Sequence, residues 1–171
     1  MSGGFYIGLF AVLFLAIAIW SSMRRAGKKQ HYDEMQLKIR ADGYRLGYFV
    51  TIALLLVLLM VLDSNLITFV SPSFAIFVVM MIGIVTSVVY CIFKGAFFQI
   101  GQNGTYYIAL CAFIGLLNTG MGILRLVDGS LFENGVITFA SGASFICGLS
   151  FLAILIALVI KKVSMGSEVT E

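Results

Sequence analysis

Five long stretches of this sequence contain no charged residue and no histidine, and they limit the fold more than any other feature. They are Phe5 to Ser22, Leu46 to Leu62, Pro72 to Phe93, Tyr106 to Leu124 and Val136 to Ile160. About 20 apolar residues in a helix cross the roughly 30 Å hydrocarbon core of a bilayer. The chain is 61% hydrophobic and only 11% charged, which is too apolar for a soluble fold of this size. The sequence therefore predicts an all-α, polytopic transmembrane bundle of five spans, forming one membrane domain over residues 1–171.

Two alternatives to five helical spans conflict with the pattern. Strands of a membrane barrel would alternate apolar and polar residues over about ten positions, whereas residues 52–60 are apolar without interruption. A cleaved signal peptide would carry basic residues before its apolar run. Here the basic pair Arg24-Arg25 follows the first run instead. We therefore expect the first run to remain as a membrane anchor.

The basic residues predict how the chain is oriented. Ten of the 11 fall on one side of the predicted bundle. They are Arg24, Arg25, Lys28, Lys29, Lys38, Arg40 and Arg45 between the first two spans, Lys94 after the third, and Lys161 and Lys162 after the fifth. The opposite side has only Arg125. Because positively charged loops tend to stay in the cytoplasm, we expect the N-terminus outside and the C-terminus inside.

Residues 23–45 form the one long polar segment, which we place in the cytosol. Asp33, Glu34 and Lys38 have helical charge spacing, and a narrow apolar stripe follows the same period. This pattern favours a helix that either lies along the inner membrane surface or extends the second span. Gly27 and Gly43 are its expected breaks. The basic residues can contact anionic lipid head groups or dock a partner protein.

The last part of this segment, residues 33–45, resembles a known group of proteins. The stretch from Asp33 to Arg45, DEMQLKIRADGYR, stands directly before an apolar run. It resembles a feature of small multi-pass membrane proteins of Gram-positive bacteria, a group without an assigned activity. The resemblance covers about 13 residues and contains no catalytic motif. It implies the cytoplasmic membrane of a bacterium.

Small residues recur at four-residue spacing in the predicted helices. Helices in lipid associate by close van der Waals approach, which small side chains allow. We therefore expect helix packing at Gly4 and Gly8 in the first span, Gly83 in the third, Gly115 in the fourth and Gly148 in the fifth. The same faces can instead bind a membrane-protein partner or a second copy, or line a narrow cavity.

Asn118 is the most polar side chain deep inside a predicted span. A buried amide needs hydrogen-bond partners. The expected partners are hydroxyl groups on neighbouring helices, namely Thr86, Ser87, Ser141 and Ser144. The alternative is that Asn118 and these hydroxyl groups provide polar contacts to a bound molecule.

The sequence lacks the residues that several classes of function require. The spans hold no ionisable group for a proton relay. Cys91, Cys111 and Cys147 stand singly in apolar runs, where they suit helix packing, and His31 is the lone histidine. Neither residue type has the spacing of a metal site or a catalytic pair. We therefore expect no enzyme, no metal and no cofactor. The small net charge of +3 also argues against a nucleic-acid partner.

The remaining hypotheses all place the chain among membrane lipids. The favoured one is a non-enzymatic accessory or regulatory protein of the cell membrane that acts through helix–helix association. The alternative is a passive binding or transport subunit for a small neutral or apolar molecule. A third hypothesis is a lipid-modifying enzyme with its site in the loops.

Overall fold

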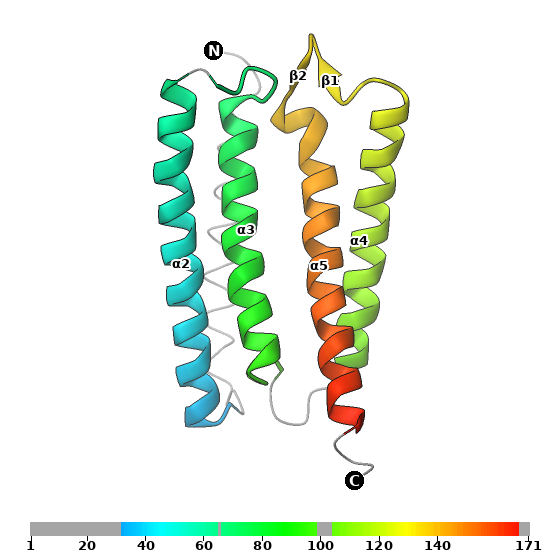
Figure 1. Ribbon diagram of the computed structural model, residues 1–171. Helices are drawn as coiled ribbons and strands as arrows, with labels where there is room; N and C mark the ends of the chain where they lie inside the picture. The colour runs from blue at the N-terminus through cyan, green and yellow to red at the C-terminus, as the bar shows by residue number, and fades with distance from the viewer. Residues whose placement is uncertain (1–31, 65, 99–103, 168–171) are drawn as a thin grey trace, which may run out of the picture. The chain divides into compact units, whose positions relative to one another are not determined.

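The computed structural model describes residues 32–64, 66–98 and 104–167, and it places four long helices in this part of the chain (Figure 1). They are α2 (Glu34–Asp63), α3 (Pro72–Phe93), α4 (Gly104–Val127) and α5 (Phe139–Ser167), with strands β1 (Phe132–Glu133) and β2 (Val136–Ile137) between the last two. The all-α prediction is confirmed, and each of these four helices is long and apolar enough to cross a membrane. The predicted span 5–22 lies outside the described residues.

The helix bounds differ from the predicted spans at two places. α2 begins at Glu34 and continues through Gly43, so the predicted break at Gly43 is wrong and residues 34–45 of the polar segment extend the second span. The predicted break at Gly27 lies outside the described residues. The fifth helix begins at Phe139, because Val136 and Ile137 form β2 instead of its first turn. The third span, 72–93, has the bounds that were predicted, and α4 exceeds the fourth by a few residues at each end.

Local sequence signals explain where the helices begin. The carboxylate of Asp33 accepts a hydrogen bond from the Glu34 amide at the start of α2. At α3, Ser71 Oγ accepts from the Phe74 amide at 3.3 Å, and Pro72 occupies the first turn, where its missing N–H costs nothing. At α5, Thr138 Oγ1 accepts from the amide of Ser141, and Ser141 Oγ accepts from the amide of Thr138. This reciprocal pair is a capping box.

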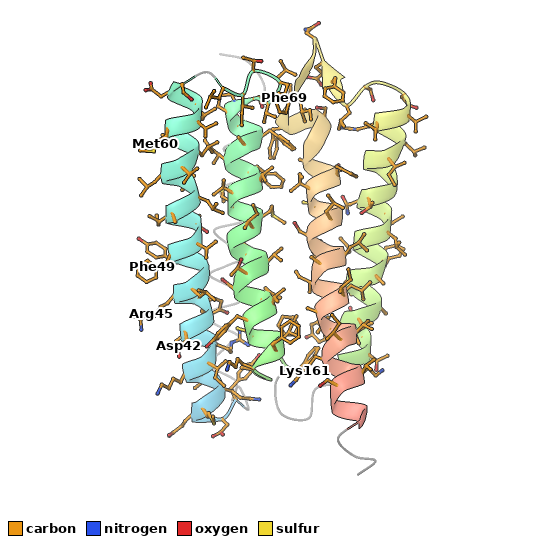
Figure 2. The ribbon with its side chains drawn as sticks, viewed as in Figure 1. Asp42, Arg45, Phe49, Met60, Phe69 and Lys161 are labelled. Carbon is orange, nitrogen blue, oxygen red and sulfur yellow. The ribbon has the colours of Figure 1, made fainter. Side chains whose placement is uncertain are left out.

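The four described helices pack as neighbours in the order α2, α3, α5, α4 (Figure 1). Among them, α2 packs mainly against α3, and α5 packs against both α3 and α4. A buried apolar cluster lies where α3 and α5 end and α4 begins, and it consists of Ile92, Cys111, Ile154, Ala157 and Leu158. We call this end of the helices the basic end. Lys94 directly follows α3 there, and Lys161 and the first turns of α2 lie at the same end (Figure 2).

The opposite end, here called the hairpin end, is held by main-chain pairing. Asn134 and Gly135 join β1 to β2 with φ angles of 55° and 80°, which is the signature of a type I′ turn. The second strand also pairs with the α2–α3 loop, because the Ile137 amide donates to Phe69 O and the Ser71 amide donates to Ile137 O, each at 2.9 Å. Arg125 Nη1 donates to Ala140 O and to Ser141 O. Arg125, the one basic residue that the described ranges place at this end, therefore ties α4 to the first turn of α5.

Candidate functional site

The contact between α2 and α3 is made by small residues on both helices, and we call it the α2–α3 seam. Its residues are Gly43, Gly47 and Thr51 of α2 and Gly83, Ser87 and Cys91 of α3. A Cβ atom on Gly47 would lie 2.6 Å from Gly83 O, and one on Gly43 would lie 2.8 Å from Cys91 Sγ. Both distances are shorter than a van der Waals contact. The two backbones therefore approach as closely as glycine permits, which is the packing mode expected in lipid.

A second seam joins α4 to α5, and there the glycines of α4 meet larger side chains of α5. A Cβ atom on Gly115 would lie 3.0 Å from Leu152, and one on Gly122 would lie 2.6 Å from the Cβ of Phe145. Gly148 of α5 faces Thr119, whose backbone is too close for any side chain at position 148. The buried hydroxyl of Thr119 has no hydrogen-bond partner in the described part of the chain. The predicted packing glycines of α4 and α5 thus lie on one contact surface.

The polar side chains inside the spans bond mostly to their own helices. Asn118 Nδ2 donates to Ile114 O at 2.9 Å, which is a bond within its own helix, and the strut from this amide group to a neighbouring helix stays a prediction. Thr86 and Ser87 likewise donate to carbonyl groups four residues earlier, at 2.8 and 3.0 Å. Ser141 belongs to the cap of α5, and Ser144 is half-buried on the same helix. The hydrogen bonds of Thr86, Ser87 and Asn118 therefore stay within α3 and α4.

The described basic residues of the polar segment lie on the first turns of α2 (Figure 2). Arg45 and Lys38 are exposed, and Arg40 Nη2 donates to Tyr44 Oη at 3.1 Å. The other four, Arg24, Arg25, Lys28 and Lys29, lie outside the described residues, as do Gly4 and Gly8. Lys161 and Lys162 lie across the basic end, on the last turns of α5.

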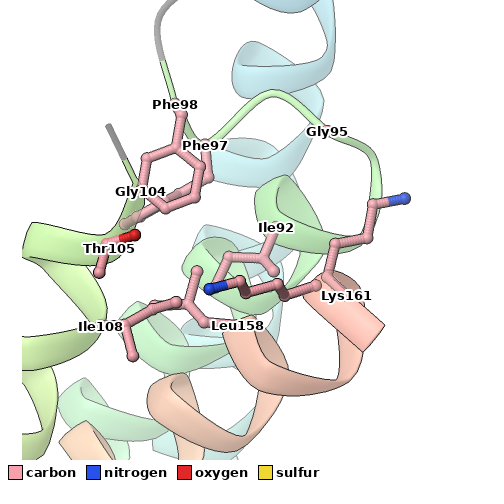
Figure 3. A pocket seen from close by; sticks show the side chains of 10 residues that line it. Ile92, Gly95, Phe97, Phe98, Gly104, Thr105, Ile108, Leu158 and Lys161 are labelled. Carbon is pink, nitrogen blue, oxygen red and sulfur yellow. The ribbon is translucent and has the colours of Figure 1, made fainter. Parts of the chain in front are cut away.

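A pocket of about 330 Å³ opens at the basic end, between the end of α3, the start of α4 and the end of α5 (Figure 3). It is formed by the sequence just after α3. There Gly95 adopts a φ of 71°, and the amides of Gly95 and Ala96 donate back to Ile92 O and Cys91 O. This is a Schellman motif, which ends a helix and turns the chain. The turn brings Phe97 and Phe98 over the start of α4.

Aromatic and aliphatic side chains make most of the pocket wall. The rings of Phe97 and Phe98 meet edge to face with centroids 4.9 Å apart, and Phe98 lies 5.5 Å from the ring of Tyr107. Ile92, Ile108 and Leu158 line the pocket opposite these rings (Figure 3), and Lys161 and Lys162 are also among its lining residues. The result is a mainly apolar hollow with two ammonium groups, a combination that suits an anionic amphiphile.

Potential metal ligands and thiol groups are dispersed over the described part of the chain. No three histidine, cysteine, aspartate or glutamate residues come close enough there to hold a metal ion. Cys91 and Cys111 are buried on different helices and carry free thiols. Each of them packs among apolar neighbours or at a helix seam.

Sequence reasoning missed the pocket and half of the α2–α3 seam. Gly43 and Gly47 precede Thr51 at four-residue spacing, so the signal that identified Gly83 was also present in α2. For the pocket, the usable signals were Phe97-Phe98 directly after a helix end and the pair Lys161-Lys162. Their proximity depends on α5 packing between α3 and α4, which no local pattern encodes.

Comparisons with known proteins give no relative from which a function can be transferred. No protein-family model, no curated protein and no solved structure matches this chain.

Proposed function

We propose that this chain is an accessory protein of the bacterial cytoplasmic membrane that associates with another membrane protein through the outer face of α2. The observation that carries the proposal is a stripe on this face. Phe49, Ala53, Leu56 and Met60 follow one another at intervals of four, three and four residues, and all are exposed. The three larger side chains are 62%, 60% and 76% exposed. This interval is the heptad spacing with which two helices pack along a shared seam.

The position of α2 in the helix order supports this proposal. Gly83 of α3, Gly115 and Gly122 of α4 and Gly148 of α5 are used in contacts within the chain, so they are not free to bind a partner. By contrast, α2 uses one narrow face for α3, and only 6% of its most apolar window is buried inside the structure. Its stripe presents a small residue, Ala53, between larger ones, which allows a partner helix to approach.

The distribution of charge supports an orientation with the basic end in the cytosol. Lys38, Arg45, Lys94, Lys161 and Lys162 are at this end. The hairpin end carries Arg125, whose guanidinium is bonded to α5, together with Asp63, Asp128 and Glu133. Because basic residues tend to be retained on the cytosolic side, we propose that the C-terminus is inside.

The alternative of a passive site for a small neutral molecule at Asn118 has less support. The amide nitrogen of Asn118 already donates to Ile114 O. The pocket at the basic end is lined by other residues and is not neutral, because two lysines contribute to it.

Photocrosslinking in the native membrane tests the association. A photoreactive phenylalanine analogue in place of Phe49 should give one discrete protein adduct, whose mass identifies either a partner or a second copy. The matched control is the same analogue in place of Phe113, which is 63% exposed on α4, and it should give only lipid adducts. An Ala53→Trp substitution should abolish the adduct at position 49, whereas Ala109→Trp on the exposed face of α4 should not. Lipid adducts alone at position 49 would refute the proposal.

A further inference from the structure

The pocket at the basic end combines a hydrophobic wall with two cationic side chains, and it has no role in the association through α2. We propose that it binds one anionic phospholipid of the surrounding leaflet, with the phosphate held by Lys161 and Lys162 and the first part of an acyl chain against Ile108 and Leu158. The volume of about 330 Å³ lies within the range of small-molecule sites, about 300–1,000 Å³. It accommodates part of a phospholipid, so the remaining acyl chain stays in the bilayer.

The depth of the pocket matches the polar boundary of a bilayer. The uninterrupted apolar run of α5 ends at Ile160, and Lys161 and Lys162 follow directly. The first long cationic side chains after a span lie at the level of the lipid head groups. Leu158 belongs to the apolar run just before this boundary, and Ile108 lines the same pocket from α4. A phospholipid beside the protein therefore presents its phosphate to the lysines and its hydrocarbon to the aliphatic wall.

The charge of the pocket selects an anion. The ten residues that line it in the described part of the chain include two lysines and no carboxylate. The wall also includes Gly104 and Thr105, the first residues of the 24-residue helix α4. The N-terminus of a helix carries a partial positive charge, which adds to the attraction of the two ammonium groups. Phe97, Phe98 and Ile92 provide no polar contact, so inorganic phosphate would leave most of the wall without a partner.

Native mass spectrometry of the full chain released from nanodiscs tests this site. The wild-type protein should retain one phosphatidylglycerol in preference to phosphatidylcholine. The Lys161→Gln/Lys162→Gln variant should bind phosphatidylglycerol about 25-fold more weakly, since each basic residue near a membrane surface contributes about a fivefold factor. The matched control is Lys38→Gln/Arg45→Gln, which removes two exposed charges from α2. Because neither residue lines the pocket, this variant should weaken binding much less than the double lysine variant.

A second variant distinguishes binding of the lipid in the pocket from a general electrostatic attraction to the membrane surface. Ile108→Trp fills the pocket from its aliphatic wall and leaves every charge in place, so it should prevent retention of the lipid as effectively as the double lysine variant. Retention that is unchanged in Ile108→Trp would overturn the proposal, and so would equal losses in the two charge variants. Competition by inorganic phosphate at millimolar concentration that displaces the lipid completely would identify a free anion as the ligand and would also overturn it.

Discussion

Some glycines in these helices leave no room for a Cβ atom, because a neighbouring helix is in contact with them, and others have open space around them. At Gly47 an added Cβ atom would lie 2.6 Å from the backbone oxygen of Gly83. At Gly120, also inside a helix, no atom of a neighbouring element lies within 4 Å. Close approach matters in lipid, because hydrocarbon provides no hydrophobic drive for helices to associate. The same residue type is therefore essential at one position and replaceable at the other.

Gly47→Ala is expected to destabilise the contact between α2 and α3. The new methyl group meets the backbone of α3, which cannot move aside without separating the helices. Overpacking of this kind costs about 1–3 kcal/mol, so the free energy of unfolding in detergent should fall by about 2 kcal/mol. The matched substitution Gly120→Ala should leave stability unchanged or raise it by up to about 1 kcal/mol, since alanine favours the helix. Equal effects of the two substitutions would contradict a tight α2–α3 seam.

Helices and strands show which parts of the fold the sequence encodes locally. The span 72–93 was predicted with the correct bounds because Ser71 and Pro72 mark a helix start. The start of the fifth helix was wrong because Val136 and Ile137 are as apolar as the span that follows. The pair Asn134-Gly135 was the available hairpin signal. The predicted break at Gly43 is wrong because the packing role of this glycine depends on Ser87 and Cys91, which are remote in sequence.

Gly135→Val is expected to open the hairpin between β1 and β2. Gly135 has a φ of 80°, and an L-residue with a branched side chain pays about 1–2 kcal/mol to adopt such a conformation. Since β2 also pairs with the α2–α3 loop, hydrogen exchange should accelerate at the amides of Ile137 and Ser71. Gly135→Asn is the control, because asparagine tolerates positive φ. Unchanged exchange in Gly135→Val would show that the turn does not hold this end together.

In the described unit as a whole, the sequence alone predicts that basic residues gather at one end, but it does not predict the order in which the helices pack. The asymmetry follows from counting basic residues between spans, and it needs no knowledge of contacts. The order α2, α3, α5, α4 depends on which helix faces fit together across long sequence separations. The pocket therefore could not be predicted, since Phe98 and Lys161 become neighbours only after α5 packs between α3 and α4. The exposed stripe on α2 is likewise a consequence of this order.

The orientation of the unit can be measured with single cysteines at its two ends. Ser130 is exposed at the hairpin end and Lys38 is exposed on the first turns of α2. If the basic end is cytosolic, a membrane-impermeant maleimide should label the Ser130→Cys variant in intact cells, because its thiol is in contact with the external medium. The Lys38→Cys variant should react only after the membrane is permeabilised. The unsubstituted protein is the background control, since its described cysteines lie within the spans. The reverse pattern of labelling would place the basic end outside, and then the retention of positive charge would not explain how this chain inserts.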